Sequence, residues 1–216
     1  MYTPNHFKES DQAVMQALIR ERPLATLVAN GEGGLFANHI PLLLEPERGE
    51  HGTLIGHVAR ANPVWKEAAG SEVLAIFHGP EAYISPNWYA TKAETGRVVP
   101  TWNYAVVHAH GHLTVHDDPA WVRALVERLT IEHESAQPAP WAVTDAPADY
   151  IEKLVGAIVG IEIVIDRLEG KWKVSQNQPE SNRAGVVKSL REANLEMAEL
   201  VKSRLGRAPA SPAPQN

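Results

Sequence analysis

The chain has 216 residues, of which 44% are hydrophobic and 21% charged, and its formal charge is −6. This composition is typical of one sizeable globular domain and excludes a wholly disordered chain. Because cysteine is absent, disulfides, zinc fingers, iron–sulfur clusters and thiol nucleophiles are excluded. No apolar run approaches the roughly 18 residues of a membrane span, and residues 1–9 lack the apolar stretch of a signal peptide. We therefore expect a cytoplasmic protein with no membrane partner.

The charge is divided unevenly along the chain. Residues 1–180 carry 14 basic and 23 acidic side chains, whereas residues 181–216 carry six basic and three acidic ones. The body should therefore repel nucleic acid, because phosphate contacts need clusters of basic side chains. The basic C-terminal helix is more simply a solvated amphipathic helix. If DNA binds weakly, we expect its contacts to come from Arg183, Lys188, Arg191, Lys202 and Arg204.

The elements expected in the first half of the chain follow from periodicity and turn residues. Ser10 or Asp11 is suited to cap a helix that stops at Pro23. Asn and Gly within residues 30–34 tolerate positive φ and predict a hairpin turn. A polar loop is expected over residues 45–52. Strands are predicted over residues 24–29, 35–44, 53–59, 72–78 and 81–85, with a short helix opened by Asn62-Pro63.

The second half begins with a polar loop over residues 86–98 and continues with longer elements. Residues 98–115 predict a long strand pair or one bent strand, with a bulge at Gly111. Asp118-Pro119 is suited to start a helix. The remaining predicted elements are a helix over 146–158, a strand over 158–168, a turn at 169–170, a partner strand over 171–175 and a final helix from Ser181 or Asn182.

This order of elements predicts a mainly β fold with flanking helices. Strands that follow one another with few crossover helices favour an antiparallel sheet, and about seven short strands with turn signals suggest a closed or split β-barrel. The absence of G-x-G-x-x-G argues against a Rossmann domain. We expect a barrel domain with inserted helices over residues 1–180, a C-terminal amphipathic helix over 181–206 and a disordered, Ala/Pro-rich tail over 207–216.

Two of the polar segments are expected in the first barrel strands. Asn38 and His39 put an amide and an imidazole into an otherwise apolar strand, as a ligand site or as a satisfied core pair. His57, Arg60 and Asn62 flank the end of a strand and the start of a helix. Free N–H groups and a forked guanidinium suit a phosphate at such a place. The alternative for Arg60 is a surface salt bridge.

Two further segments combine aromatic rings or lysines with small polar groups. Residues 83–89 and 99–104 interleave Trp and Tyr with hydrogen-bonding side chains. This pattern suits a planar heteroaromatic ligand that stacks and is bound at its edge, or else a core or a dimer interface. In residues 171–177, two lysines are followed by Ser175, Gln176 and Asn177. That segment is suited to a phosphate or to the edge of a ring.

A row of histidines occupies even-numbered positions of the long strand, so these side chains share one face. Neutral imidazoles at i and i+2 could bind a metal. A row of imidazoles at the solvent or at an interface is the simpler interpretation, because the opposite face is apolar and suits the barrel interior. The row consists of His108, His110, His112 and His116.

Taken together, these segments resemble the PaiB family, described as FMN-binding negative transcriptional regulators with an FMN-binding split barrel. The matches run in the family's order over about residues 1–190. Two departures are Val174, where Leu is expected, and Gln178, where Arg is expected. The matching motifs are Met1-Tyr2-x-Pro4-x-x-Phe7, Ala37-Asn38-His39-Ile40-Pro41, His57-x-Ala59-Arg60-x-Asn62-Pro63-x-Trp65, Tyr83-Ile84-Ser85-Pro86-x-Trp88-Tyr89, Val99-Pro100-Thr101-Trp102-Asn103-Tyr104 and Lys173-x-Ser175-Gln176-Asn177.

The resemblance implies an antiparallel, six-stranded split barrel related to that of pyridoxamine-phosphate oxidases, and a homodimer with FMN held between the subunits. It implies that Arg60, with His57 and Asn62, contacts the phosphate. The residues that would face the isoalloxazine are Asn38, His39, Thr101, Trp102 and Asn103, and those that would close the site are Ser175 and Gln176.

Three function classes follow. The first is a flavin-dependent oxidoreductase or flavin sensor linked to transcriptional repression. The second is a cofactor-free, transcription-linked protein that acts through a protein partner or through DNA, although no segment is typical of a helix-turn-helix with a basic recognition helix. The third is a haem-binding split-barrel protein, with the histidine row as a source of an axial ligand. The visible absorption spectrum separates these classes.

Overall fold

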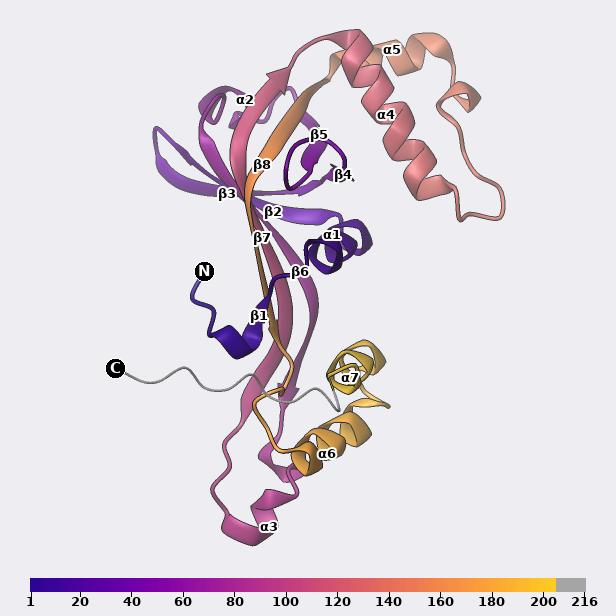
Figure 1. Ribbon diagram of the computed structural model, residues 1–216. Coiled ribbons are helices and arrows are strands. Elements are labelled where there is room, and N and C mark those ends of the chain that lie inside the picture. The colour runs from indigo at the N-terminus through magenta and orange to yellow at the C-terminus, as the bar shows by residue number, and fades with distance from the viewer. Residues whose placement is uncertain (205–216) are drawn as a thin grey trace. The chain divides into compact units, whose positions relative to one another are not determined.

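The computed structural model describes residues 1–204 (Figure 1). The predicted tail over 207–216 and the end of the predicted C-terminal helix lie outside these residues. The strands form one sheet in the order β3-β2-β6-β7-β8-β5-β4, and β1 pairs with β8. The pairs β1–β8, β2–β3, β2–β6, β4–β5 and β5–β8 are all antiparallel, which confirms the sheet type expected from the sequence.

The chain divides into two compact units. Unit 1 contains Met1–Met15, His78–Val107 and the chain from Glu169 onward. Unit 2 contains Gln16–Phe77 and His108–Leu168. Three long strands contribute residues to both units: β6 (Glu72–Ile84), β7 (Thr101–His116) and β8 (Ile158–Lys173). Helix α1 (Gln12–Glu21) also does so, and it ends before Pro23 as expected.

The first two strands of unit 2 form the predicted hairpin. β2 (Leu24–Gly31) pairs with β3 (Gly34–Pro41) through the turn expected over residues 30–34. The predicted strand over 35–44 is instead divided into β3 and β4 (Leu43–Glu45). The chain leaves the β2 pairing at Leu42, whose N–H donates to the carbonyl oxygen of Pro23. β4 then pairs with β5 (Thr53–Ala59), and the short α2 (Val64–Glu67) follows.

A helical insertion completes unit 2. Asp118 caps α4 (Pro119–Glu134) by accepting hydrogen bonds from the backbone N–H groups of Ala120 and Trp121, as its position before Pro119 predicts. After η3 (Val143–Asp145), α5 (Ala148–Gly156) leads into β8. The insertion has a small core of its own, made of Val122, Val143, Ile151 and Val155.

The long strands correct two predictions and decide a third. Residues 72–78 and 81–85 form the single strand β6. Of the two alternatives for residues 98–115, a strand pair or one strand, the structure has one strand, β7. The turn predicted at 169–170 does not exist, because β8 runs through it and Gly170 pairs with Glu9 of β1 (Lys8–Glu9). A Cβ at Gly170 would lie 2.7 Å from the sulfur of Met15. At Gly111 it would lie 2.1 Å from the carbonyl oxygen of Val164. Both glycines therefore permit close packing.

Unit 1 contains short helices where a polar loop was predicted. After η1 (Asn5–Phe7) and β1, these are η2 (Pro86–Trp88) and α3 (Thr91–Thr95). The predicted final helix is two helices, α6 (Glu180–Leu190) and α7 (Leu195–Lys202). Asn194 separates them: its backbone N–H donates to the carbonyl of Leu190, and its side chain caps α7 by accepting from the Met197 N–H.

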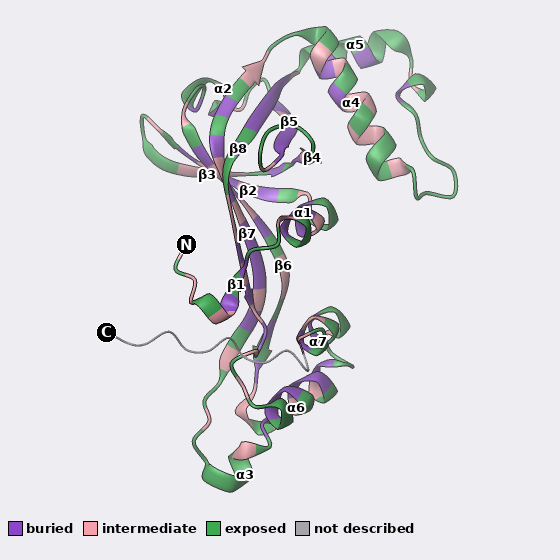
Figure 2. Cartoon of the chain, in the orientation of Figure 1, coloured by how far each residue is buried: buried purple, intermediate pink, exposed green. Residues whose placement is uncertain are grey.

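The two C-terminal helices bury apolar side chains on one face, as the predicted amphipathic helix requires (Figure 2). Val186, Leu190, Met197 and Val201 are buried, and so, against expectation, is the charged Arg183. Arg183 donates to the backbone carbonyl of Arg204, and the Arg204 guanidinium donates to the carboxylate of Glu9. Arg183 is therefore not part of an exposed basic face. Among the described residues, none of the helices combines the length and apolarity that a membrane crossing needs.

Candidate functional site

Two of the predicted site residues in unit 2, Asn38 and Asn62, meet through their side chains. Asn38 lies on the half-buried face of β3, and Asn62 precedes α2. The Asn62 amide nitrogen donates to the Asn38 side-chain oxygen at 2.8 Å, while the Asn62 side-chain oxygen accepts from the Val64 N–H at 3.0 Å. The pair therefore connects the edge of the sheet to the start of the helix that the Asn62-Pro63 sequence predicts.

His39 does not join this pair. It lies on the exposed face of β3, opposite Asn38, because successive side chains of a strand point to opposite faces. Its Nδ1 lies 3.2 Å from the hydroxyl of Thr26 on β2, which is its partner in the register. Within one chain, Asn38 and His39 cannot both face one ring from the same side of the strand.

Protein groups accept four hydrogen bonds from the Arg60 guanidinium, which has five N–H donors. Its two terminal nitrogens donate to the carboxylate of Asp117, at 2.9 and 2.6 Å. Its Nε donates to the carbonyl of Gly156, and one terminal nitrogen also reaches the carbonyl of Ile158. The hydrogen bond from Arg60 lowers the pKa of Asp117, and that same bond raises the pKa of Arg60. The surface salt bridge allowed for Arg60 is thus present, and a phosphate here would have to compete with Asp117.

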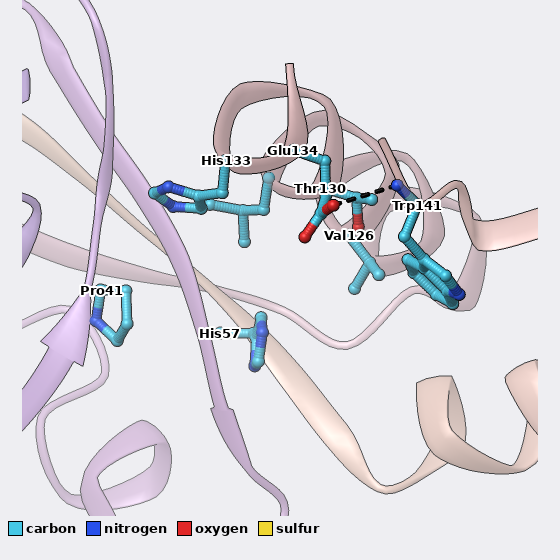
Figure 3. A pocket seen from close by; sticks show the side chains of 8 residues that line it. Pro41, His57, Val126, Thr130, His133, Glu134 and Trp141 are labelled. Carbon is cyan, nitrogen blue, oxygen red and sulfur yellow. Dashed lines mark hydrogen bonds between the residues drawn. The ribbon is translucent and has the colours of Figure 1, made fainter. Parts of the chain in front are cut away.

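His57 faces a different part of unit 2 from Arg60 and Asn62. Its half-buried imidazole lines an open groove of about 350 Å³, together with Pro41 and the side chains of α4 (Figure 3). Burial lowers the pKa of His57. Within residues 1–204, no hydrogen bond joins His57 to Arg60 or Asn62. The three residues of the predicted phosphate group therefore have three separate environments.

In unit 1, the start of β7 and the end of β8 bring a lysine onto polar groups. The ammonium of Lys173 donates to the Thr101 hydroxyl and, at 2.7 Å, to the Trp102 carbonyl. Burial lowers the pKa of Lys173, and the nearby positive charge of Lys171 lowers it further. In the described part of the chain, no carboxylate forms an ion pair with either lysine. Two neighbouring ammonium groups of this kind would be stabilised by an anion.

A buried polar pair, Asn103 and Ser175, follows Thr101 and Lys173 by two residues along each segment. The Asn103 amide donates to the Ser175 hydroxyl at 2.9 Å, and both side chains are buried. Ser175 has φ of 63°, and no other non-glycine residue among those described has positive φ. Such backbone costs about 1–3 kcal/mol and concentrates at ligand sites. Gln176 folds back locally, with its side chain bonded to the backbone of Val174 and Trp172.

Exposed aromatic rings lie beside these polar groups in unit 1. Trp102 and Tyr83 are about half exposed and contact edge to face, with ring centroids 6.0 Å apart. The Lys171 ammonium lies over the ring of Tyr104 at 5.2 Å and over that of Tyr2 at 5.9 Å. Aromatic area, hydrogen-bond donors and positive charge from residues 83–104 and 171–177 therefore occur together in unit 1.

The histidine row has the orientation predicted from its spacing: its four positions are half-buried or exposed, and the alternate positions of β7 are mostly buried. The row is divided among different partners. The rings of His108 and His110 lie 6.3 Å apart, His112 is 3.0 Å from a carboxylate oxygen of Asp166, and His116 stacks on Trp121. The row thus takes part in several local contacts.

Sequence reasoning missed the far wall of the groove at His57. That wall consists of α4 residues and Trp141, which follows the helix. The sequence does contain a pattern that could have indicated this wall, because the α4 residues recur at helical spacing and so share one face of the helix. They are Val126, Leu129, Thr130, His133 and Glu134.

Comparison with known proteins assigns this chain to a family. Residues 1–167 match the family model described as "Putative FMN-binding domain", and the chain therefore belongs to that family. It is 32% identical to "Protease synthase and sporulation protein PAI 2" of Bacillus subtilis over 213 residues, which cover 95% of this chain and 98% of that protein. The resemblance to the PaiB family is thus confirmed. An uncharacterized protein of Emericella nidulans is 36% identical, covering 87% of this chain and 89% of its own.

Solved structures with low sequence identity share the fold. The FAD- and heme-binding protein of Mycobacterium smegmatis superposes with a TM-score of 0.58 at 15% identity, covering 77% of this chain and 73% of that one. The flavocytochrome Anf3 of Azotobacter vinelandii gives 0.57 at 14% identity, covering 77% and 69%. The predicted fold class, a mainly antiparallel split barrel with flanking helices, is confirmed.

Proposed function

We propose that this chain binds FMN and that Lys173, with Lys171, holds the phosphate. The observation that carries the proposal is the pair of neighbouring ammonium groups without a carboxylate partner among the described residues, in a chain whose family is described as FMN-binding. A phosphate would remove the repulsion between the two lysines and accept charge-assisted hydrogen bonds from them. Arg60 is the competing anchor, and its bonds to Asp117 count against it.

The donor set of unit 1 fits the rest of such a cofactor. The Thr101 hydroxyl can bond a polar ring edge or the ribityl chain, and the exposed Trp102 indole offers a stacking surface. Asn103 and Ser175 are buried and bonded to each other, so we assign them to positioning the Lys173 strand end. Bound FMN would supply the electron-transfer chemistry, while these residues bind and orient it.

We further propose that the protein is a flavin-dependent oxidoreductase or flavin sensor with a link to transcriptional repression. The supporting observation for that link is the 32% identity to the B. subtilis PAI 2 protein, whose name refers to protease synthesis and sporulation. The acidic body argues for action through a protein partner, because it disfavours direct phosphate contacts. NAD(P)H-driven bleaching of the flavin would favour the oxidoreductase, and a reduced state that changes partner binding would favour the sensor.

We also propose a homodimer, supported by the half-exposed Tyr83 and Trp102 and by the enrichment of aromatic residues at interfaces. Sedimentation at micromolar concentration should give about twice the 23.7 kDa of one chain. A single species near 24 kDa would contradict this part of the proposal.

The deciding experiment for the cofactor is the absorption spectrum of the purified protein, followed by titration with FMN. We expect flavin bands at about 370 and about 450 nm, general properties of an oxidised flavin that the cofactor itself contributes. A Soret band instead would favour the haem alternative. A colourless protein that takes up neither cofactor would contradict the proposal and favour a partner-binding role.

A further inference from the structure

The groove beside His57 in unit 2 is a second site, separate in its residues from the proposed FMN contacts. Its floor and walls are mainly apolar and include Pro41, Val126, Leu129 and the ring of Trp141. Figure 3 shows His57 and Pro41 on one side and the α4 side chains with Trp141 on the other. The groove volume, about 350 Å³, is in the range of sites for small molecules.

One carboxylate is fixed within this apolar surface. An oxygen of Glu134 accepts the backbone N–H of Trp141 at 3.0 Å, across seven residues of chain, which orients the carboxylate at the end of α4. Among the described residues no arginine or lysine pairs with Glu134. By contrast, Glu45 of this unit pairs with Arg48 and Arg128, and Glu162 pairs with Arg48. Glu134 therefore keeps its negative charge available.

The titratable groups that face the groove determine which ligand charge it favours. Burial lowers the pKa of His57, so this imidazole is neutral at physiological pH and can accept a hydrogen bond. His133 lies on the same wall and is exposed. Glu134 is the acidic residue of the lining and no Lys or Arg belongs to it, and this charge favours a cation over an anion.

We propose that this groove binds a small organic cation, namely a flat apolar body that carries a protonated amine or amidine. The apolar body would lie between Trp141 and the side chains of Val126 and Leu129. The cationic group would meet the free oxygen of Glu134, and His57 would accept a further hydrogen bond. A cation near the Trp141 ring gains an additional electrostatic attraction. The inference does not depend on flavin binding.

The test uses the full chain and three probes of one shape: benzamidine, which is cationic, benzamide, which is neutral, and benzoate, which is anionic. Binding is followed by the ¹H–¹⁵N signal of the Trp141 indole, assigned with Trp141→Phe. We expect benzamidine to shift this signal with saturation in the millimolar range or below. Benzamide should bind at least fivefold more weakly, and benzoate should not bind.

Matched variants of α4 distinguish binding at the groove from a general effect of the protein's charge. Glu134→Gln should weaken benzamidine at least fivefold, whereas Glu132→Gln removes the same charge from an exposed residue outside the groove and should change nothing. Thr130→Arg, which places a cation on the wall, should abolish binding while Glu134 remains. No binding of benzamidine at 10 mM, equal binding of benzoate, or equal loss in both Gln variants would overturn the proposal.

Discussion

The carboxylate of Asp117 accepts hydrogen bonds from both terminal nitrogens of Arg60, 57 residues earlier in the sequence. Two of the three remaining N–H groups of the guanidinium donate to the carbonyls of Gly156 and Ile158, at the junction of α5 and β8. Arg60 therefore links three segments of unit 2: the end of β5, the end of β7 and the start of β8. A residue with that many protein partners is poorly placed to provide the main phosphate contact. Titrations of variants with FMN and riboflavin test this conclusion.

The first prediction concerns the phosphate anchor. Lys173→Gln should weaken FMN binding about ten- to hundredfold and riboflavin binding much less, because riboflavin lacks the phosphate. The magnitude follows from charge-assisted hydrogen bonds of about 1.5–3 kcal/mol each. Titration of the apo-protein with both ligands provides the measurement, and Lys188→Gln, an exposed lysine of α6, is the matched control.

Arg60→Ala tests the competing assignment in the same titrations. We expect similar losses for FMN and riboflavin, because removal of Arg60 frees Asp117 and the α5–β8 junction rather than a phosphate. A loss confined to FMN would return the phosphate to Arg60, as the sequence pattern predicts, and would remove Lys173 from that role.

The second prediction is a pH dependence of stability. The hydrogen bond from Arg60 lowers the pKa of Asp117 below its ordinary value of 3.8. A carboxyl whose folded pKa is depressed stabilises the protein above its unfolded pKa, and this contribution is lost as the pH falls through the folded pKa. Asp117→Asn should therefore lower the melting temperature at pH 7, and the difference from wild type should shrink below pH ~4. A difference that is unchanged at pH 2.5 would contradict this account.

The third prediction concerns a close approach in unit 1. A Cβ at Gly185 would lie 2.0 Å from the backbone carbonyl oxygen of Trp88, so α6 can pack on η2 only with glycine there. Gly185→Ala gains about 1 kcal/mol of helix propensity, but it forces a backbone shift that costs about 1–3 kcal/mol. We expect a net loss of stability in thermal or urea unfolding, with displacement of the Trp88 signal.

Gly156→Ala is the control for that variant. Gly156 ends α5, and no neighbouring atom lies within 4 Å of a Cβ built there. Its replacement should be neutral or slightly stabilising. If both alanine variants unfolded alike, the loss at Gly185 would reflect something other than contact with Trp88.

The fourth prediction is weak, electrostatic binding of DNA by the isolated protein. Because Arg183 is buried, Lys202 is paired with Glu199 and Arg204 with Glu9, the exposed contacts expected at this end reduce to Lys188 and Arg191. The logarithm of the affinity should fall with that of the salt concentration by about 0.9 for each phosphate neutralised. Lys188→Ala with Arg191→Ala should abolish the residual binding. Tight, sequence-specific binding at physiological salt would show that the charge distribution has been misjudged.

The sequence by itself determined the features that depend on neighbouring residues. The Asn/Gly turn before β3, the Asp118 cap of α4 and the alternation that separates the histidines of β7 from its apolar face are all local preferences of backbone and side chain. The sheet type and the fold class followed from such signals, whereas the family followed from the resemblance of the motifs. The sequence marked the polar motifs at the start of β7 and the end of β8 separately, and only the structure joins Lys173 to Thr101 and Trp102.

Only the tertiary structure decided what the ambiguous positions do. Gly170 has the sequence signature of a turn, yet it lies inside β8 because β1 pairs with it and Met15 packs where a side chain would project. The sequence left open whether Arg60 binds a phosphate or a carboxylate. In the structure, the Arg60 guanidinium donates to the carboxylate of Asp117. The physical reason is the same in both cases. A local pattern fixes which conformations and bonds a residue can adopt, whereas the atoms that compete for it come from distant parts of the chain.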